Sequence, residues 1–291
     1  MYNEFYGFKE PPFNLTPNSR FFFASDKHAE ALSSLVYAIN QRKGFIVITG
    51  EIGSGKTTVT RALLNKLDAK TDVALIANTH LGSRDLLMAI LDDLEIEYKP
   101  GPKARLLSQF TEYLIRQLKN RVNVVLIIDE AQNLKPSVLE EVRMLSNLET
   151  EEEKLIQIIL IGQPELKKKL CLPQLEQLRQ RVAVYYHLKP LDRQESRKYI
   201  LHRLKVASGT DRRYFTDAAI ERIYEYSIGV PRIINHICDQ SLLSGYIDEI
   251  QTIDEHLVQQ VILDSPLLQP SSARKNLNEK GIESWEKSHA L

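Results

Sequence analysis

The sequence has 291 residues, 43% of them apolar and 26% charged, which is the composition of a folded globular chain with enough interior for one large or two modest domains. Lysine plus arginine and aspartate plus glutamate number 38 each, so the overall charge gives no sign of a nucleic-acid, membrane-surface or acidic-substrate binder. The two cysteines, Cys171 and Cys238, lie far apart, which argues against a disulfide framework or a zinc site and favours a reducing compartment. No apolar run approaches the roughly 20 residues that cross a bilayer, and no signal peptide is evident, so work at a membrane would require recruitment by another protein.

The N-terminal segment is rich in aromatic residues. Residues 2–23 contain eight aromatic side chains and three prolines, which predicts an extended strip pinned to a domain surface by its rings. Ser25-Asp26 then offers an N-cap, and apolar residues recur at helical spacing from Ala31 to Ile39. We expect a helix here that leads into the first strand.

A glycine-rich motif follows the apolar run at residues 45–49. It matches G-x-x-x-x-G-K-[ST], with a predicted strand before it and a helical pattern over residues 58–67 after it. Its glycines leave backbone N–H groups free to surround a phosphate at a helix start, Lys56 would lie near the β- and γ-phosphates, and the Thr57 hydroxyl would bind Mg²⁺. The full spacing argues against the alternative, a glycine-rich connection without a ligand. The predicted nucleotide site comprises Gly50, Glu51, Ile52, Gly53, Ser54, Gly55, Lys56, Thr57 and Thr58.

Four more short apolar strands alternate with helices up to about residue 190. The strands are expected at residues 73–78, 122–128, 155–161 and 182–188, and the helices at 84–94, 105–118 and 136–148. Five buried strands in such an alternation predict an α/β fold with a five-stranded parallel sheet covered by helices on both faces.

Beyond residue 190 the strand pattern stops. Helical patterns cover residues 193–206, 216–226, 231–246 and 254–263, which predicts a small all-helical domain. The expected domains are therefore an N-terminal strip at 1–24 packed on the core, a nucleotide-binding domain at 25–190, a helical lid at 191–264 and a polar flexible tail at 265–291.

Two carboxylates end the most strand-like run in the chain. Asp129 is expected at the end of a strand beside the strand of the glycine-rich motif, directed at the Mg²⁺ held by Thr57. Glu130 is the candidate for polarising the attacking water, because phosphoryl transfer depends mainly on positioning and charge stabilisation. The alternative for the pair is a cap on a following helix.

Four further polar residues are candidates for contacting phosphate. Gln163 ends the strand at 155–161 and could bind the γ-phosphate or the water, although an unliganded turn residue is an equal alternative. Arg179 and Arg181 precede the last strand and would face away from their own site, so a role on phosphate requires a neighbouring subunit, and surface ion pairing is the alternative. Arg232 opens a helix of the lid and could report on lid closure.

These motifs together resemble the AAA+ ATPase superfamily. The N-terminal run from Phe5 to Pro17, F-Y-G-F-K-E-P-P-F-N-L-T-P, is similar to that of the general secretion pathway protein A (ExeA-like) family, and the resemblance covers about residues 1–264. It implies that Lys56 and Thr57 serve nucleotide and Mg²⁺, and that Asp129 and Glu130 form the second nucleotide motif. It also implies that Gln163 is the first sensor, Arg181 or Arg179 an arginine finger, and Arg232 the second sensor.

The resemblance also implies a biological setting. It implies an ATP- and Mg²⁺-dependent ATPase that forms a homo-oligomer with shared sites, is cytoplasmic, and drives or switches an envelope secretion, pilus or polysaccharide-export machine at the inner membrane. Family members in type II secretion typically continue into a membrane span and a periplasmic part, which we do not expect in this chain, and Gln163 replaces the more usual Asn, Ser or Thr. A DNA-associated ATPase resembling transposition helpers is the second hypothesis, although the neutral charge counts against it. A nucleotide-dependent scaffold with little turnover is the third.

Overall fold

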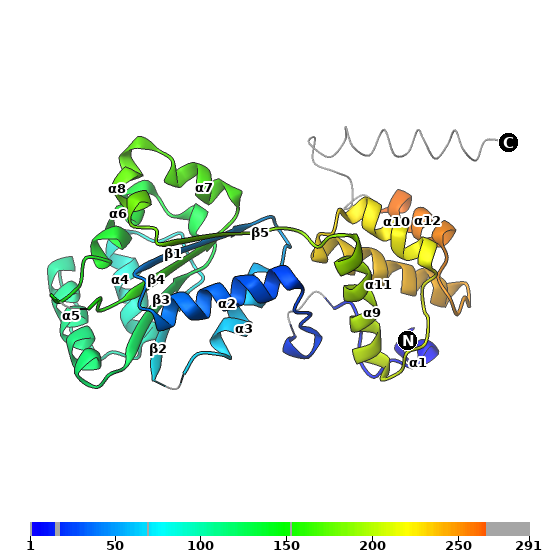
Figure 1. The fold of residues 1–291 in the computed structure, drawn as a ribbon, viewed down its shortest axis with the longest axis horizontal. Coiled ribbons are helices and arrows are strands. Elements are labelled where there is room, and N and C mark those ends of the chain that lie inside the picture. The colour runs from blue at the N-terminus through cyan, green and yellow to red at the C-terminus, as the bar shows by residue number, and fades with distance from the viewer. Residues whose placement is uncertain (1, 15–17, 69, 152, 266–291) are drawn as a thin grey trace. The chain divides into compact units, whose positions relative to one another are not determined.

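The computed structural model describes residues 2–14, 18–68, 70–151 and 153–265, which belong to two compact units (Figure 1). The first in this description, the sheet unit, comprises Asp26–Lys189. The second, the helical unit, combines Met1–Ser25 with Pro190–Leu291. Each unit is described by itself below.

The sheet unit is built on five parallel strands in the order β2-β3-β4-β1-β5. The strands are β1 (Phe45–Gly50), β2 (Thr71–Ile76), β3 (Asn123–Ile128), β4 (Gln157–Gly162) and β5 (Val184–Leu188). This confirms the five-stranded parallel sheet that the sequence predicts. Because parallel strands place all their carboxyl ends at one edge, the residues that follow β1, β3 and β4 come together there.

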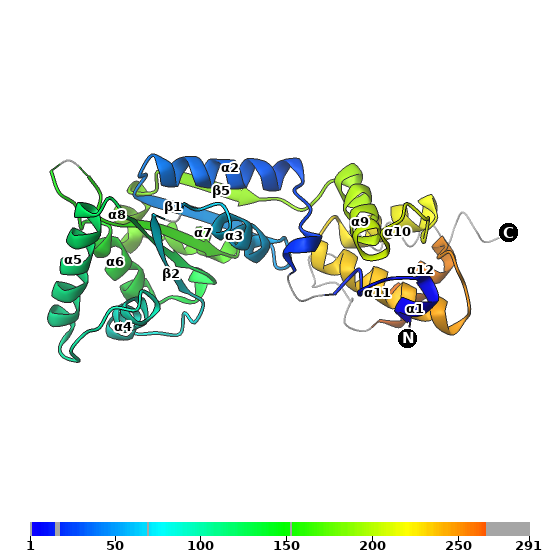
Figure 2. The same cartoon turned by 90° about the horizontal axis from the view of Figure 1, so that it is seen from below.

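Both faces of the sheet are buried, and alternate strand residues serve different cores. Val47, Leu126 and Leu160 point into one hydrophobic cluster, whereas Ile46, Ile127 and Ile161 point into another. The second cluster is covered by α2 (Asp26–Asn40) and α3 (Lys56–Leu64). The first is covered by α4 (Ser83–Asp93), α5 (Lys103–Lys119), α6 (Pro136–Leu145), α7 (Pro164–Leu170) and α8 (Glu176–Gln180), as Figure 2 shows. Two-sided burial explains why the strands read as continuous apolar runs.

Some short elements were not predicted from the sequence. Helix α7 begins directly after Gln163, where only a turn was expected, and α8 lies within the segment that carries the candidate arginines. The 3₁₀ turns are η1 (Ser19–Phe21), η2 (Ala131–Asn133) and η3 (Pro173–Leu175).

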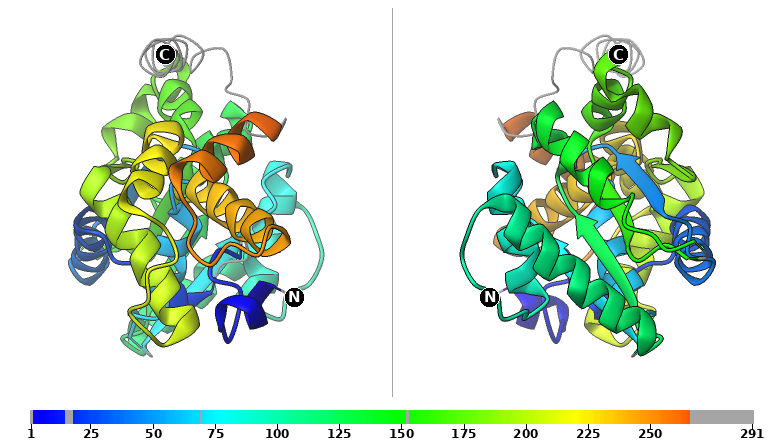
Figure 3. Two further views of the ribbon diagram at one scale, coloured as in Figure 1. Left: turned by 90° about the vertical axis from the view of Figure 1, so that its right-hand side faces the viewer. Right: turned by 90° about the vertical axis from the view of Figure 1, so that its left-hand side faces the viewer.

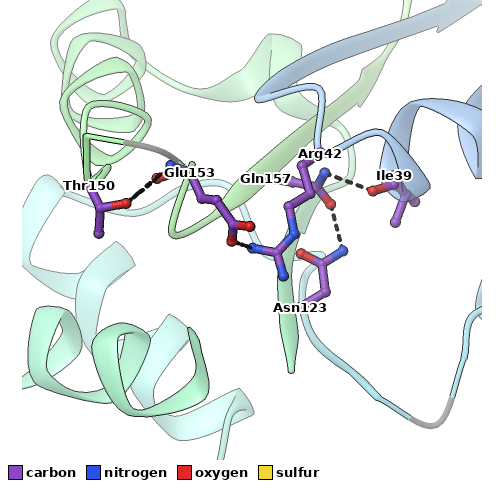
Figure 4. Close-up of polar contacts among 6 residues, drawn as sticks. All are labelled: Ile39, Arg42, Asn123, Thr150, Glu153 and Gln157. Atoms are coloured by element: carbon purple, nitrogen blue, oxygen red, sulfur yellow. Dashed lines mark hydrogen bonds and ion pairs between the residues drawn. The ribbon is translucent and has the colours of Figure 1, made fainter. Parts of the chain in front are cut away.

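A polar junction closes the opposite, amino-terminal edge of the sheet (Figure 4). Gln157 is fully buried; its side-chain amide donates to the carbonyl of Ile39 at 2.9 Å and accepts from the side chain of Asn123, also at 2.9 Å. Close by, Arg42 pairs with Glu153 at 2.7 Å. The junction ties the end of α2 to the starts of β3 and β4, with the buried Gln157 amide bonded at both ends.

The helical unit contains four longer helices, shown from yellow-green to orange in the left view of Figure 3. They are α9 (Arg193–Ser208), α10 (Asp217–Ser227), α11 (Pro231–Ile247) and α12 (Glu255–Asp264). The side chains of Asp192, Thr216 and Asp254 cap three of them by accepting a backbone N–H from the third helical residue. This run of helices explains why the strand pattern stops near residue 190.

The aromatic N-terminal strip belongs to the helical unit. Its first described residues form a short helix, α1 (Tyr2–Tyr6), rather than the extended strip that the sequence predicts, and Tyr6 at the end of this helix is buried against Tyr214. Phe8, Phe13 and Phe21 are buried in the core of the same unit. The strip is thus part of the interior of the helical unit.

A buried arginine of α9 binds the backbone of this strip. The guanidinium of Arg203, on α9, donates to the carbonyls of Pro12 at 2.6 Å and Asn14 at 3.3 Å and lies 5.0 Å from the ring centre of Phe21. Arg203 is only 7% exposed, and its buried charge is stabilised by the hydrogen bonds to backbone carbonyls and by the contact with the Phe21 ring.

The proposed tail lies almost wholly outside the described residues, which end at Ser265. Among the residues that are described, no helix has both the length and the apolar character needed to pass through a bilayer.

Candidate nucleotide-binding and catalytic site

The glycine-rich loop connects β1 to α3 at the carboxyl edge of the sheet. Gly53 and Gly55 have φ values of +78° and +99°, in the region that favours glycine, and Gly55 is the residue before α3. A side chain at Gly50 would meet the Ser54 hydroxyl at 2.6 Å and the Leu188 carbonyl at 2.9 Å. The loop is therefore a tight backbone cradle that side chains at these glycines would fill.

A histidine from α2 supports the same loop. The Nε2 atom of His28 lies 3.3 Å from the Ser54 carbonyl and 2.8 Å from the place where Gly55 would carry a Cβ. His28 was not predicted as a site residue, since only the fold brings α2 against the loop. The contact gives a second reason, besides φ, for glycine at position 55.

Lys56 is buried within this cradle. Its ammonium donates to the carbonyls of Gly50 at 2.8 Å and Glu51 at 3.0 Å. Burial lowers the pKa of Lys56, and the nearby carboxylates of Glu130 and Asp129 act in the opposite direction. The two carboxylates therefore lie within electrostatic range of Lys56.

Asp129 and Glu130 follow β3 at the same edge. Contrary to the sequence expectation, β3 is not adjacent to β1, because β4 lies between them. Asp129 accepts the backbone N–H of Glu130 at 2.8 Å. Burial raises the pKa of the Asp129 carboxyl, and the Glu130 N–H and the Lys56 charge act in the opposite direction.

Gln163 occupies the tip of β4, between β1 and β3. Its side-chain amide donates to Glu130 Oε2 at 3.1 Å. The polar residue at the strand tip thus reaches the predicted water-polarising carboxylate, rather than forming only an isolated turn. Lys56, Asp129, Glu130 and Gln163 form one cluster at the carboxyl edge.

Glu130 has an unusual backbone conformation. Its φ is +51°, a left-handed value that is rare for a residue with a side chain, and its carbonyl accepts the hydroxyl of Thr79 at 3.2 Å. Glu130 precedes η2 but makes no side-chain cap there, so the helix-capping alternative for this carboxylate does not hold. Strained residues that surrounding contacts hold in place are typical of functional sites.

Gln132, Thr79 and Lys169 contribute to this arrangement, although sequence reasoning gave them no role. Gln132 donates to Glu130 Oε2 at 2.5 Å and accepts the backbone N–H of Gln163 at 3.1 Å. The only sequence signal for Gln132 is its place two residues after Glu130. Its partners Gln163 and Lys169 lie 31 and 37 positions further along the chain, so only the fold shows that they contact Gln132.

The candidate arginines lie elsewhere. Arg179 and Arg181 are exposed at the end of α8. They precede β5 at its amino-terminal end, where the Ala183 N–H binds the carbonyl of Phe45, the first residue of β1. This is the end of β1 away from the glycine-rich loop, as expected for arginines that do not serve their own site. Arg232 lies in the first turn of α11, within the helical unit.

Residues 39–170 match the family model described as "AAA domain". The chain is also 44% identical, over 247 residues, to general secretion pathway protein A of Aeromonas hydrophila. The chain contains an AAA domain and is a homologue of general secretion pathway protein A. The alignment covers 84% of this chain but 45% of that relative, so this chain corresponds to less than half of the relative.

Solved structures of AAA+ proteins share the fold. The ORC2 protein of Aeropyrum pernix aligns with a TM-score of 0.65 at 13% identity, over 92% of this chain and 74% of that one. Drosophila ORC bound to DNA gives 0.64 at 17% identity, over 94% and 66%. A mutant form of Thermotoga maritima RuvB gives 0.55 at 20% identity, over 82% and 69%. At these identities the likeness establishes the fold alone, and it confirms the predicted AAA+ architecture with its helical C-terminal region.

The AAA domain fits a magnesium nucleotide by its chemistry. Ser54 Oγ is buried in the cradle and has no hydrogen-bond partner within the described structure. Among the described residues, no group of three or more His, Cys, Asp or Glu side chains could hold a metal by itself. That arrangement suits Mg²⁺, which usually takes one or two protein oxygens, here Thr57 and Asp129, together with phosphate oxygens and water.

Proposed function

We propose that this AAA domain binds ATP with Mg²⁺ and hydrolyses it to ADP and phosphate. The observation that carries the proposal is the meeting of three chain segments at one edge of the sheet. The loop after β1 supplies Lys56, the end of β3 supplies Asp129 and Glu130, and the tip of β4 supplies Gln163. Phosphoryl transfer requires positive charge near the phosphates and a carboxylate to position water, and the buried Lys56 and the two nearby carboxylates supply these groups.

Each residue has a defined task in this proposal. The backbone N–H groups of residues 50–58 surround the phosphates, and Lys56 exchanges its present carbonyl partners for phosphate oxygens. Thr57 and Asp129 hold Mg²⁺, which supplies charge neutralisation on the phosphates when bound. Glu130 orients the attacking water and accepts its proton, and Gln163 fixes the direction of the Glu130 carboxylate.

Subunits share their sites in this proposal. Arg181, or Arg179 in its place, reaches the nucleotide of a neighbouring subunit, because both arginines lie at the far end of their own β1 and β5. For Arg232, in the first turn of α11, we propose the second-sensor role that the resemblance implies. A permanently charged planar guanidinium suits both positions.

The partner is a protein assembly of the envelope. The homologous chain is named general secretion pathway protein A, which supports a role in driving or switching a secretion, pilus or polysaccharide-export machine. We place the protein in the cytoplasm, with recruitment to the inner membrane by that machine.

ATP turnover and nucleotide retention test this function together. The wild type should release phosphate from ATP only when Mg²⁺ is present. Glu130→Gln should bind ATP as tightly as the wild type but release no phosphate, because the amide cannot accept the proton of water. Equal turnover in the two proteins would remove Glu130 from its role, and no turnover in the wild type, with or without partner extract, would overturn the ATPase assignment.

DNA is the alternative partner, and the same assay decides it. Drosophila ORC was solved bound to DNA, but at 17% identity this likeness bears on the fold only. An increase in ATP turnover on adding duplex DNA, which becomes smaller as the salt concentration is raised, would favour the hypothesis of a DNA-associated ATPase. Capture of envelope proteins by ATP-loaded Glu130→Gln, with no response to DNA, would favour the secretion machine.

A further inference from the structure

Gln132 bonds to both of its polar neighbours at the catalytic edge. Its amide nitrogen donates to Glu130 Oε2 at 2.5 Å, and its amide oxygen accepts the backbone N–H of Gln163 at 3.1 Å. Only this orientation of the amide satisfies both partners, since a flipped amide would set oxygen against carboxylate and N–H against N–H. Gln132 therefore links the end of β3 to the tip of β4.

The fold is built to accept this side chain. A Cβ at Gly162 would lie 2.7 Å from Gln132 Oε1, so a side chain there would push the amide away. On the other side, the Lys169 ammonium of α7 binds the carbonyls of Gln132 at 2.5 Å and Leu134 at 2.8 Å. The backbone and the side chain of Gln132 are thus held from separate elements.

The two carboxylate oxygens of Glu130 have different surroundings. Oε2 accepts hydrogen bonds from the side-chain amides of Gln132 and Gln163, whereas Oε1 has no hydrogen-bond partner within the described residues. A carboxylate fixed through one oxygen presents the other in a constant direction, which is what the positioning of a water molecule requires. Without the bridge, only the longer Gln163 bond would restrain the side chain.

We propose that Gln132 is a positioning residue that joins Glu130 to the tip of β4, so that the carboxylate and Gln163 are held as one unit. The proposal rests on the proposed ATPase function and deepens it. Gln132 does not contact the nucleotide in this role; it acts through Glu130. Two hydrogen bonds with separate acceptor and donor atoms allow each half of the bridge to be removed alone.

Two variants separate the halves. Gln132→Met fills a similar volume and removes both hydrogen bonds. Gln132→Glu keeps an oxygen to accept the Gln163 N–H but replaces the donor to Glu130 with a second carboxylate oxygen, which repels the Glu130 carboxylate. The matched control is Gln157→Met, which removes two hydrogen bonds of a buried glutamine at the opposite edge of the sheet (Figure 4).

Amide hydrogen exchange gives a readout that does not depend on turnover. Without nucleotide, the backbone N–H of Gln163 should exchange faster in Gln132→Met than in the wild type. In Gln132→Glu the same N–H should exchange at nearly the wild-type rate. Unchanged exchange at Gln163 in Gln132→Met would show that the bridge does not exist in solution and would overturn the proposal.

Kinetics give the second readout. Both Gln132 variants should lose about 10-fold or more in kcat, while the Kd for ATP stays within about 2-fold in the uncharged Gln132→Met, because that variant disturbs only the positioned carboxylate. Gln157→Met should melt at a lower temperature and keep the kcat of the wild type.

The outcomes distinguish the inference from the function on which it rests. A wild-type kcat in Gln132→Met would overturn the positioning role and leave the ATPase assignment intact. A wild type without turnover would overturn the ATPase assignment, while the exchange experiment would still decide whether the bridge exists.

Discussion

Gln132 occupies the space that a side chain at Gly162 would need, with its amide oxygen 2.7 Å from the ideal Cβ position. The glycine is not required by a left-handed backbone, because its φ lies outside that region. Because Gly162 has no side chain, the Gln132 amide of the loop after β3 can contact the tip of β4. The two residues therefore form a matched pair across adjacent strands.

Gly162→Ala should impair turnover more than folding. The added methyl group would displace the Gln132 amide, and with it the Glu130 carboxylate, so we expect kcat to fall by about 10-fold while ATP affinity changes little. The matched control is Gly101→Ala, whose Cβ would meet only the side chain of Arg105, with the Cδ atom at 2.9 Å, and that side chain is exposed and movable. Steady-state ATPase assays and melting temperatures of both variants check the prediction. Equal kcat in Gly162→Ala and Gly101→Ala would contradict it.

Lys56→Met should abolish ATP binding without unfolding the protein. The ammonium is buried and lies near two carboxylates, and in the proposed site it is the main cation for the phosphates. We expect a loss of at least about 100-fold in affinity, or roughly 2.7 kcal/mol, by calorimetry. Burial lowers the pKa of Lys56, which means that the charged ammonium lowers the stability of the folded protein. Without nucleotide, the melting temperature of Lys56→Met should therefore equal or exceed that of the wild type. An exposed lysine of α7 provides the control, Lys168→Met, which should bind ATP normally; equal affinity in both variants would refute the role of Lys56.

The strands, most helices and the catalytic candidates could be predicted because their signals are local. Five apolar runs, the G-x-x-x-x-G-K-T spacing and the Asp129-Glu130 pair are each contained in a short window of sequence. The place of Gln163 beside Glu130 also follows from chain geometry, since parallel strands end at one edge. Local pattern and parallel topology were enough for this much.

Strand order and long-range partners could not be read from the sequence. Nothing local indicates that β4 separates β3 from β1, nor that the rings of the N-terminal strip pack on α9 and Tyr214 in the helical unit. Helix α7 was missed because it is seven residues long and starts at a proline that also suits a turn. Gln132 was missed because its role depends on residues contributed by β4 and α7.

Arg181→Ala should stop turnover while leaving ATP affinity largely intact. Arg181 is favoured over Arg179 as the finger because Arg179 lies 3.8 Å from Glu176, whereas no carboxylate pairs with Arg181 among the described residues. An exposed guanidinium without a carboxylate partner is available to an anion arriving from a neighbouring subunit.

Mixed assemblies reveal whether the arginine acts between subunits. Arg181→Ala alone should lose on the order of 10³-fold in kcat, and mixing it with Glu130→Gln should restore part of the activity, because some sites then combine an intact Glu130 with an intact Arg181. Arg116→Ala, an exposed arginine of α5, is the control and should retain full activity. No recovery on mixing, with assembly intact by light scattering, would argue against sharing. Recovery with Arg179→Ala but not with Arg181→Ala would make Arg179 the finger.

His202 should make the helical unit sensitive to mild acid. It packs against Phe23 of the N-terminal strip, with ring centres 5.7 Å apart, and burial lowers its pKa below the ordinary value of 6.5, with the neighbouring Arg203 acting in the same direction. The unfolded chain therefore binds a proton at His202 more readily than the folded chain does. The stability that neutral His202 contributes is fully present above pH 6.5 and is lost as the pH falls toward the lower, folded pKa.

His202→Gln, which cannot titrate, should weaken this dependence on pH. Melting temperatures measured between about pH 7.5 and pH 5 should fall less steeply in the variant than in the wild type, and one proton limits the difference to about 1.4 kcal/mol per pH unit before solvent screening reduces it. His256→Gln replaces an exposed histidine of α12 in the same unit and should leave the dependence unchanged. Identical pH profiles for His202→Gln and the wild type would show that the packing of Phe23 on His202 does not set the acid sensitivity. A profile flattened only in His202→Gln would tie that sensitivity to the contact between α9 and the N-terminal strip.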